Sequence, residues 1–291
     1  MPAEPLLSVL TPSHNRRESL LRKLVSLREQ ELQPGLFEWV VSFDRDSDGS
    51  QQALEEELNR RPPAFRVVLT TNPGRPGAAA ARNHAATLAQ GRLLLFSDDD
   101  VLLPPGCLAA HLAEHRDAAA AVVSGDLRLP AARRTGVGRE PFEQPGGRGR
   151  DGLWINITGA NTSLPAETFH AVGGYDESFS AYGGEDSDLG LRLRRHGSRI
   201  IRSAAAWAYH DGSVLADVDK AFSAGRAGVR VWRKHGDLEP ALMLGVHPLL
   251  IQVKRAAMLP PFRWLMRPAV RAYEEAYLRG ALAELRENRE T

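Results

Sequence analysis

Three consecutive aspartates, Asp98, Asp99 and Asp100, follow the short apolar run Leu93–Phe96. Adjacent carboxylates repel one another, so this cluster costs stability unless a cation or hydrogen-bond donors compensate. Oxygen ligands suit hard divalent ions such as Mg²⁺ or Mn²⁺, and an ion bound here would neutralise the diphosphate of a substrate. The cluster therefore predicts a metal and diphosphate site. A solvated turn that caps the next helix is the alternative.

A second acidic stretch follows the apolar run Phe37–Phe43. Its residues meet the spacing of a calcium-binding EF-hand loop: Asp44, Asp46, Asp48, Gly49 and Glu55. An EF-hand loop joins two helices, whereas this stretch would leave a strand. We therefore favour a different interpretation, in which Asp44 binds a nucleobase or ribose and Asp48 or Ser50 caps the next helix.

Basic residues near two further turns could also bind a nucleotide. Pro12, His14 and Arg16 lie in the turn after the first apolar run, where backbone amides and Arg16 could contact a base or phosphate. Arg82 follows a glycine-containing turn at residues 74–77, and its guanidinium could hold a diphosphate. Ordinary helix capping and an ordinary turn are the alternatives. Neither the Walker lysine pattern nor the dinucleotide glycine fingerprint occurs.

Acidic residues also start a helix near the middle of the chain. Gly184 precedes Glu185 and Asp186, and the helix macrodipole favours the charged form of carboxylates at this position. An ionised Asp186 could act as a general base, although plain capping of the helix explains the spacing equally well. His210 follows the last strand-like run, where a lone histidine is more often structural than a metal ligand.

These residues are spaced along alternating apolar strands and helices. The predicted strands cover residues 6–11, 37–43, 65–69, 93–96 and 120–125, and the predicted helices cover 16–30, 50–60, 78–89 and 104–116. Pro12 is expected to end the first strand, and residues 199–203 and 205–209 form two further elements. Strands that are apolar on both faces predict an α/β fold with a parallel sheet covered by helices.

Two regions depart from this alternation. Residues 133–151 are rich in Gly, Arg and Pro, which predicts either a lid over a bound substrate or a disordered insertion. Beyond residue 213 the pattern is helical, with basic residues (Lys254, Arg255, Arg263, Arg267, Arg271) among apolar ones (Met258, Leu259, Phe262, Trp264, Leu265). Such a mixture could rest on an anionic membrane surface, or pack on the catalytic domain or on another subunit of a homo-oligomer.

Composition limits the class of protein. The 291 residues are 43% hydrophobic and 25% charged, as in folded proteins. With 37 Lys and Arg against 36 Asp and Glu, a nucleic-acid partner is not expected. Cys107 is the only cysteine, which excludes an internal disulfide. The first residues lack the pattern of a signal peptide. We therefore expect a cytoplasmic protein that could lie at the inner face of the membrane.

Taken together, the segments resemble the inverting family 2 glycosyltransferases of the GT-A fold over residues 6–212. The order of the motifs carries the resemblance. LLSVLTPSHNR is similar to the opening strand and turn of the family, FEWVVSFDRDSDGS to its second strand, and ARNHAATLAQGRLLLFSDDDVLLPP to the approach to its DXD motif. VGGYDESFSAYGGEDSDLGLRL is similar to its ED motif and to the Gly-Gly-Glu-Asp segment of the galactosyltransferase group.

The resemblance implies a Rossmann-like, mostly parallel sheet in a catalytic domain over residues 1–212, with a helical extension over 213–291. It implies Asp100 and His210 as ligands of Mn²⁺ or Mg²⁺ and Asp186 as the catalytic base. The nucleotide sugar would be bound by Pro12, His14, Arg16, Asp44, Arg82, Asp98 and Asp99, and the acceptor by Trp154, Gly184 and Glu185. Phe43 and Arg45 stand where many members of the family have aspartate and glycine. UDP is therefore favoured over GDP or TDP only because it is the usual nucleotide of the family.

The implied reaction is a single displacement at the anomeric carbon of a nucleotide sugar, with a glycan or lipid-linked acceptor. Two other functions compete with it. A sugar nucleotidyltransferase would use a similar sheet, but its glycine-rich, lysine-bearing opening loop is missing here. A binding protein with this fold and no turnover would not require Asp98, Asp100, Asp186 and His210 together.

Overall fold

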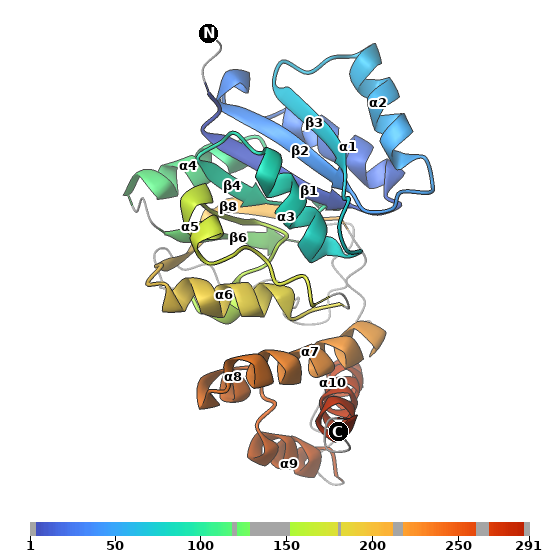
Figure 1. The fold of residues 1–291 in the computed structure, drawn as a ribbon, viewed down its shortest axis with the longest axis vertical. Helices are drawn as coiled ribbons and strands as arrows, with labels where there is room; N and C mark the ends of the chain where they lie inside the picture. Colours follow the sequence, from blue (N-terminus) through green and yellow to red (C-terminus); the bar gives the residue numbers. More distant parts are fainter. Residues whose placement is uncertain are drawn as a thin grey trace. The chain divides into compact units, whose positions relative to one another are not determined.

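A computed structural model describes residues 4–117, 121–128, 152–179, 182–211, 218–259 and 268–287. The chain divides into two compact units. One comprises Met1–Glu177 and Leu189–Gly212, and the other comprises Ser178–Asp188 and Ser213–Thr291. The first unit holds the sheet and the second holds the C-terminal helices (Figure 1).

The first unit alternates strands and helices over its amino-terminal half. Its strands are β1 (Leu7–Ser13), β2 (Phe37–Phe43), β3 (Arg66–Thr71), β4 (Leu93–Phe96), β5 (Val101–Leu102), β6 (Val122–Arg128), β7 (Thr162–Pro165) and β8 (Ile200–His210). Its helices are α1 (Arg17–Arg28), α2 (Ser50–Arg60), α3 (Ala78–Leu88), α4 (Cys107–Asp117), α5 (Ala166–Ala171) and most of α6 (Glu185–Arg195), with short 3₁₀ turns at Pro34–Leu36 and Trp154–Asn156.

Within the described ranges the strands form one eight-stranded sheet in the order β3-β2-β1-β4-β7-β6-β8-β5. The pairs β1–β2, β1–β4, β2–β3 and β6–β8 are parallel, and the pairs β4–β7, β6–β7 and β5–β8 are antiparallel. The expected α/β fold is confirmed. The parallel strands β1, β2 and β4 are buried along their whole length, whereas the parallel strand β3, at the end of the sheet, is not.

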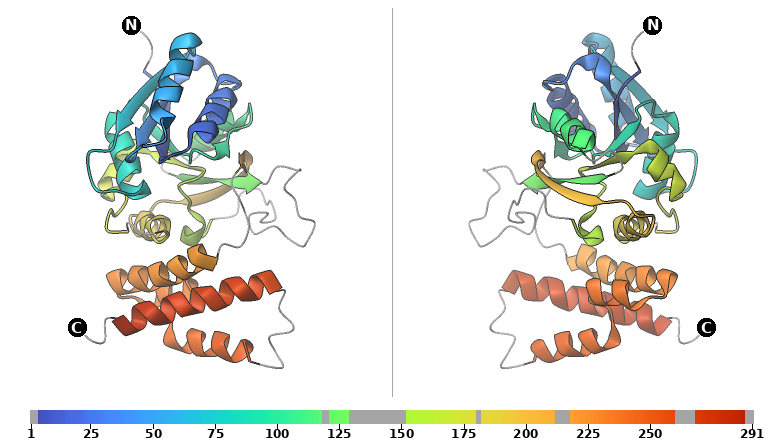
Figure 2. Two further views of the ribbon diagram at one scale, coloured as in Figure 1. Left: turned by 90° about the vertical axis from the view of Figure 1, so that its right-hand side faces the viewer. Right: turned by 90° about the vertical axis from the view of Figure 1, so that its left-hand side faces the viewer.

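Helices cover both faces of the parallel strands. Leu20, Leu24 and Leu27 form the buried stripe of α1 and join the core that contains Val9 and Trp39. The connection from β3 to β4 crosses the sheet in the opposite direction from the connection between β1 and β2. Since such connections are right-handed, α1 and α3 lie on opposite faces of the sheet. Figure 2 shows this arrangement.

Two expectations about the strands are wrong. The first strand does not end before Pro12 but continues through it to Ser13. The carbonyl oxygen of Leu10 accepts from the backbone N–H of Ser97 on the β4 side, and that of Ser13 accepts from Asp44 on the β2 side. Because the backbone groups of successive residues alternate between the two sides, those of Pro12 face the β4 side, where pairing has already ended. The missing N–H of proline therefore costs no ladder hydrogen bond there.

The two elements expected at residues 199–209 are a single strand, β8. The expected break coincides with an irregularity in the pairing of β8 with β6. Gly125 pairs with Ser203 and Leu127 pairs with Ala208, so β8 contains extra residues between these two pairs. A Cβ on Gly125 would lie 1.9 Å from the carbonyl oxygen of Ala206, so only glycine fits opposite the irregularity.

The second unit contains α7 (Val218–His235), α8 (Leu238–Met243), α9 (Pro248–Ala257) and α10 (Pro268–Glu287). The helices α7 and α10 pack closely (Figure 2). A Cβ on Gly225 would lie 2.0 Å from the carbonyl oxygen of Tyr277, and one on Gly280 would lie 1.9 Å from that of Phe222. Among the described helices, none is both long and apolar enough to cross a bilayer. The loop predicted at 133–151 lies outside the described residues.

Candidate active site

Polar residues gather at the carboxyl ends of three neighbouring parallel strands. Strands β2, β1 and β4 are adjacent, so their carboxyl ends share one edge of the sheet. Asp44 follows β2, Ser13 ends β1, and the three aspartates Asp98, Asp99 and Asp100 follow β4. Ligands of open α/β sheets bind at this edge.

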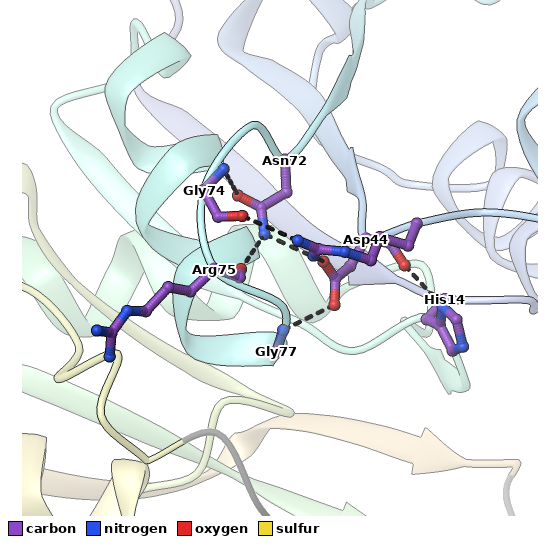
Figure 3. A network of polar contacts seen from close by, with 7 residues as sticks. His14, Asp44, Asn72, Gly74, Arg75 and Gly77 are labelled. Carbon is purple, nitrogen blue, oxygen red and sulfur yellow. Dashed lines mark hydrogen bonds and ion pairs between the residues drawn. The ribbon is translucent and has the colours of Figure 1, made fainter.

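Asp44 is held in place by the loop that follows β3 (Figure 3). The backbone N–H of Gly77 donates to its Oδ2 at 2.7 Å, and the side-chain amide of Asn72 donates to its Oδ1 at 3.1 Å. Arg45 forms an ion pair with Oδ1 at 3.0 Å. The carboxylate is 13% exposed. Its orientation is therefore set by the protein, while Oδ2 keeps a further lone pair for a ligand.

The turn that follows β1 is attached to the loop that follows β2. His14 Nδ1 lies 2.6 Å from the backbone oxygen of Asp44 and donates to it. Asn15 has a φ of 54°, and its side-chain oxygen accepts from the backbone of Ser47 at 2.8 Å. Arg16 is exposed, and its backbone N–H donates to Ser50 Oγ. These contacts place His14 and Arg16 beside the end of β2.

Asp48 lies directly before Gly49, the N-cap residue of α2, and binds a backbone N–H of the first turn of the helix. Its Oδ1 accepts from the backbone N–H of Ser50 at 2.9 Å, and Oδ2 of Asp46 accepts from that of Gln51 at 3.0 Å. Both carboxylates accept hydrogen bonds from backbone N–H groups at the amino-terminal end of α2. This arrangement favours the capping interpretation over a calcium-binding loop.

Residues 98–100 form the acidic turn, and its first two aspartates have protein partners. Asp98 Oδ1 lies 2.7 Å from Nη2 of Arg82, which is only 4% exposed. Ser13 donates to Oδ2 of Asp99 at 2.9 Å. Burial, with the nearby charges of Asp100 and Asp98, raises the pKa of Asp99 to about 7, although the Ser13 hydrogen bond and Arg16 oppose the shift. Asp99 therefore contributes less than a full negative charge near neutral pH.

Asp100 lies beside His210 because β5 pairs with β8. Val101 is in register with His210, and the backbone N–H of Asp211 donates to the carbonyl oxygen of Asp100 at 2.7 Å. Asp100 Oδ1 and His210 Nε2 are 3.7 Å apart, and the side chains are 18% and 21% exposed. The pairing of β5 with β8 thus brings together the two predicted metal ligands, which lie far apart in the sequence.

The pair fits a divalent cation. Both atoms are ordinary ligands, and at 3.7 Å they are close enough that Asp100 and His210 would hold one ion together. Across the residues that the structure describes, no group of three or more His, Cys, Asp or Glu side chains is arranged around a metal site. Mg²⁺ often binds through one or two protein ligands, with water and substrate phosphates completing its shell.

Lys23 binds the backbone of the acidic turn from the interior of the first unit. Its side chain is fully buried, and Nζ donates to Ser97 Oγ at 2.7 Å and to the carbonyl oxygens of Asp98 and Val101 at 2.9 and 2.8 Å. Burial lowers the pKa of Lys23 to about 8, and the three aspartates oppose that shift. The ammonium group is therefore largely charged at pH 7 and uses all three of its N–H donors.

The remaining predicted residues lie in several elements. Pro12 is buried within β1, and Trp154, in a 3₁₀ turn of the first unit, is only 1% exposed. Gly184, Glu185 and Asp186 belong to the second unit, Gly184 directly before α6 and the other two in its first turn. Their roles toward the acceptor and as a base stay predictions.

A family model described as glycosyl transferase family 2 matches residues 8–161. The chain belongs to this family. A second model, the N-terminal domain of galactosyltransferase, matches residues 153–210 of this glycosyltransferase.

Curated relatives agree with the family. The chain is 33% identical over 275 residues to validoxylamine A glucosyltransferase of Streptomyces hygroscopicus subsp. limoneus, an alignment that covers 83% of this chain and 59% of the relative. It is 27% identical to the succinoglycan biosynthesis protein ExoA of Rhizobium meliloti, covering 78% of this chain and 70% of that protein. This glycosyltransferase spans about three fifths of the length of the first of these relatives.

Solved structures share the fold. The mannosyltransferase PcManGT of Pyrobaculum calidifontis, in complex with GDP-Man and Mn²⁺, superposes with a TM-score of 0.71 at 17% identity, covering 98% of this chain and 88% of that chain. Residues 1–349 of TarS from S. aureus, in complex with UDP, give a TM-score of 0.59 at 18% identity, covering 98% and 92%. At these identities the likeness shows the fold alone.

Sequence reasoning missed two supporting residues of this glycosyltransferase. Lys23 lies three residues after Leu20 and four before Leu27, so its position on the apolar stripe of α1 was the available signal. The second is Asn83, whose side chain binds both backbone groups of Tyr175 and the carboxylate of Glu177, and thereby fastens the turn after Gly174.

Proposed function

We propose that this chain transfers a sugar from a nucleotide-diphosphate sugar to a hydroxyl group of a glycan or lipid-linked acceptor, with inversion at the anomeric carbon. The observation that carries the proposal is the approach of Asp100 and His210 to 3.7 Å, at the sheet edge where Asp44 and Asp98 also lie. Family membership favours this function over a nucleotidyltransferase or a non-catalytic binding protein.

The donor is bound by side chains that the first unit already orients. Asp44, held by Gly77 and Asn72, accepts from the nucleobase, with Pro12, His14 and Arg16 alongside. Asp98, paired with Arg82, and Asp99 contact the ribose and the diphosphate side. Asp100 and His210 hold Mn²⁺ or Mg²⁺, which supplies positive charge to the leaving diphosphate when bound.

Asp186 accepts the proton of the attacking acceptor hydroxyl. Its position in the first turn of α6 favours the ionised carboxylate that a general base requires. Glu185 and Gly184 contact the acceptor. One base and one displacement invert the anomeric configuration.

Polysaccharide or glycoconjugate synthesis is the proposed setting. The relatives include proteins named for glucosyl transfer to validoxylamine A, O-antigen biosynthesis and succinoglycan biosynthesis. The structural neighbours were solved with GDP-Man, UDP and UDP-GlcNAc. We propose a UDP-sugar as the donor.

The test is turnover of UDP-glucose, UDP-galactose, UDP-N-acetylglucosamine, GDP-mannose and TDP-glucose, with and without Mn²⁺. We expect metal-dependent release of one nucleoside diphosphate, and a sugar product whose anomeric configuration is opposite to that of the donor. Asp186→Asn should lower turnover at least a hundredfold, whereas Glu56→Gln, on the exposed side of α2, should not. Retention of configuration, or no turnover of any donor, would contradict the proposal.

The second unit suggests peripheral membrane contact at the inner face. Leu249, Val253 and Leu259 are 70%, 64% and 60% exposed, and Arg255 is exposed beside them. Residues 240–273 contain five basic residues and no acidic ones. Exposed apolar and basic side chains together suit an anionic lipid surface, where a lipid-linked acceptor would lie.

Co-sedimentation with phosphatidylglycerol vesicles tests this contact. We expect binding that weakens with salt and is lost in a Leu249→Glu/Val253→Glu variant, while Leu88→Glu, in the first unit, serves as the control. No sedimentation of the parent protein would exclude the contact. Self-association that the double variant abolishes would instead identify this surface as the interface of a homo-oligomer.

A further inference from the structure

The last turn of α7 binds a buried carboxylate in the first turn of α6. Asp188 is fully buried, and its Oδ1 lies 2.6 Å from Nζ of Lys234 and 2.8 Å from Nε2 of His235. An ionised carboxylate only accepts, so both nitrogens donate to it. A buried carboxylate that lost such partners would strongly destabilise the folded state. The two donors therefore hold Asp188 firmly.

The other end of the same segment also rests on α7. Gly183 and Gly184 have φ angles of 90° and 97°, which favour glycine. A Cβ on Gly184 would lie 2.7 Å from the ring of Phe179 and 3.0 Å from the Cβ of Ala227, a residue of α7. The backbone N–H of Asp188 donates to the carbonyl oxygen of Gly184 at 2.8 Å and closes the turn.

Residues 184–188 are thus fixed at both ends by one helix of the second unit. Asp186 lies between the two attachment points, within the same helical turn as Asp188. This segment is grouped with the C-terminal helices rather than with the sheet. The second unit therefore contains both the proposed base and the side chains that fix its backbone.

We infer that Lys234 and His235 are positioning residues, which act through Asp188 to hold Asp186 in the geometry that proton transfer requires. The inference rests on the proposed function, because it assumes that Asp186 is the base. A misplacement of about 1 Å can cost on the order of a hundredfold in rate. Releasing Asp188 from α7 frees the first turn of α6, where backbone N–H groups have few intrahelical partners.

The experiment compares His235→Leu, which removes the donor, with His235→Gln, whose amide N–H can reach Asp188. Each is measured with the fastest donor of the five nucleotide sugars and Mn²⁺. We expect His235→Leu to lower kcat at least tenfold with the donor KM within twofold of the parent. His235→Gln should recover most of kcat. Arg233→Met is the matched control, because Arg233 lies in the same turn of α7 but donates to Glu284 and Leu285 of α10.

Hydrogen exchange gives a readout that does not depend on the donor. We expect the amides of residues 185–189 to exchange faster in His235→Leu than in Arg233→Met. If His235→Leu does not fold, the same measurements on Lys234→Met test the inference. The Lys234 side chain is 34% exposed, so its replacement should destabilise the fold less.

The outcomes separate the inference from the proposed function. If Asp186→Asn retains turnover, the proposed function fails. If Asp186→Asn is inactive while His235→Leu and Lys234→Met keep kcat within twofold, the positioning inference fails alone. Equal loss of donor binding, kcat and thermal stability would show a purely structural contact and would also overturn it.

Discussion

The ammonium group of Lys23 lies 2.7 Å from the hydroxyl of Ser97, the residue directly before the acidic turn. The same nitrogen binds the backbone on either side of Asp100, at Asp98 and Val101. A buried cation thus holds the backbone that carries the metal ligand, and its charge offsets the repulsion among the three aspartates.

Replacing Lys23 with methionine should destabilise the first unit. The substitution keeps the volume roughly constant but leaves the hydroxyl of Ser97 and two buried carbonyl oxygens without their donor. We expect a loss of about 2–4 kcal/mol in the free energy of unfolding. Urea unfolding at pH 7 measures it, with the exposed Arg17→Met on the same helix as control. Equal stability of the two variants would show that water replaces the ammonium group.

Arg82→Met should affect donor binding more than turnover. Asp98 loses the ion pair at 2.7 Å that orients it, and it is 30% exposed, so it can rotate into solvent. We expect the donor KM to rise about tenfold, which corresponds to about 1.4 kcal/mol, with a smaller change in kcat. Steady-state kinetics distinguish the two parameters. Arg92→Met, exposed next to the opposite end of β4, should leave both unchanged.

The protein should lose stability in mild acid. Burial lowers the pKa of His111 to about 4 and that of His115 to about 4, whereas an unfolded histidine titrates near 6.5. Between these values the unfolded chain binds more protons than the folded protein, so stability falls as the pH decreases from 6.5 toward 4. The expected loss is about 1.4 kcal/mol per histidine per pH unit in this range.

Urea unfolding at pH 7.5 and 5.5 measures this dependence. His111→Gln should be less stable at pH 7.5, because the hydrogen bonds of the imidazole to Ser163 and Asn161 are disturbed. It should also show a smaller difference between the two pH values. His196→Gln changes an exposed imidazole and should behave as the parent does. An identical pH dependence in all three proteins would contradict the assignment.

Much of the first unit could be predicted because its strands are apolar on both faces. That pattern places Asp44 after β2 and the three aspartates after β4, and parallel pairing then brings them to one edge. The capping of α2 by Asp48 could likewise be predicted, since it depends only on residues close in sequence.

Features that depend on pairing could not be predicted. Pro12 lies within a strand because β4 stops pairing with β1 after Leu10, and the local sequence does not show where a neighbouring strand ends. The continuity of β8 depends on its pairing with β6 and β5. The attachment of Asp188 to α7 joins residues 46 and 47 positions apart in the sequence, and acidic residues near a helix start indicate capping alone.

Metal-dependent hydrolysis of the preferred nucleotide sugar tests the central claim most directly. The parent, Asp100→Ala and Glu29→Ala, which removes an exposed carboxylate at the end of α1, are compared with and without Mn²⁺. We predict that turnover requires Mn²⁺, falls at least a hundredfold in Asp100→Ala and is unchanged in Glu29→Ala. Equal turnover by Asp100→Ala and the parent would contradict the assignment of this sheet edge as the metal and donor site.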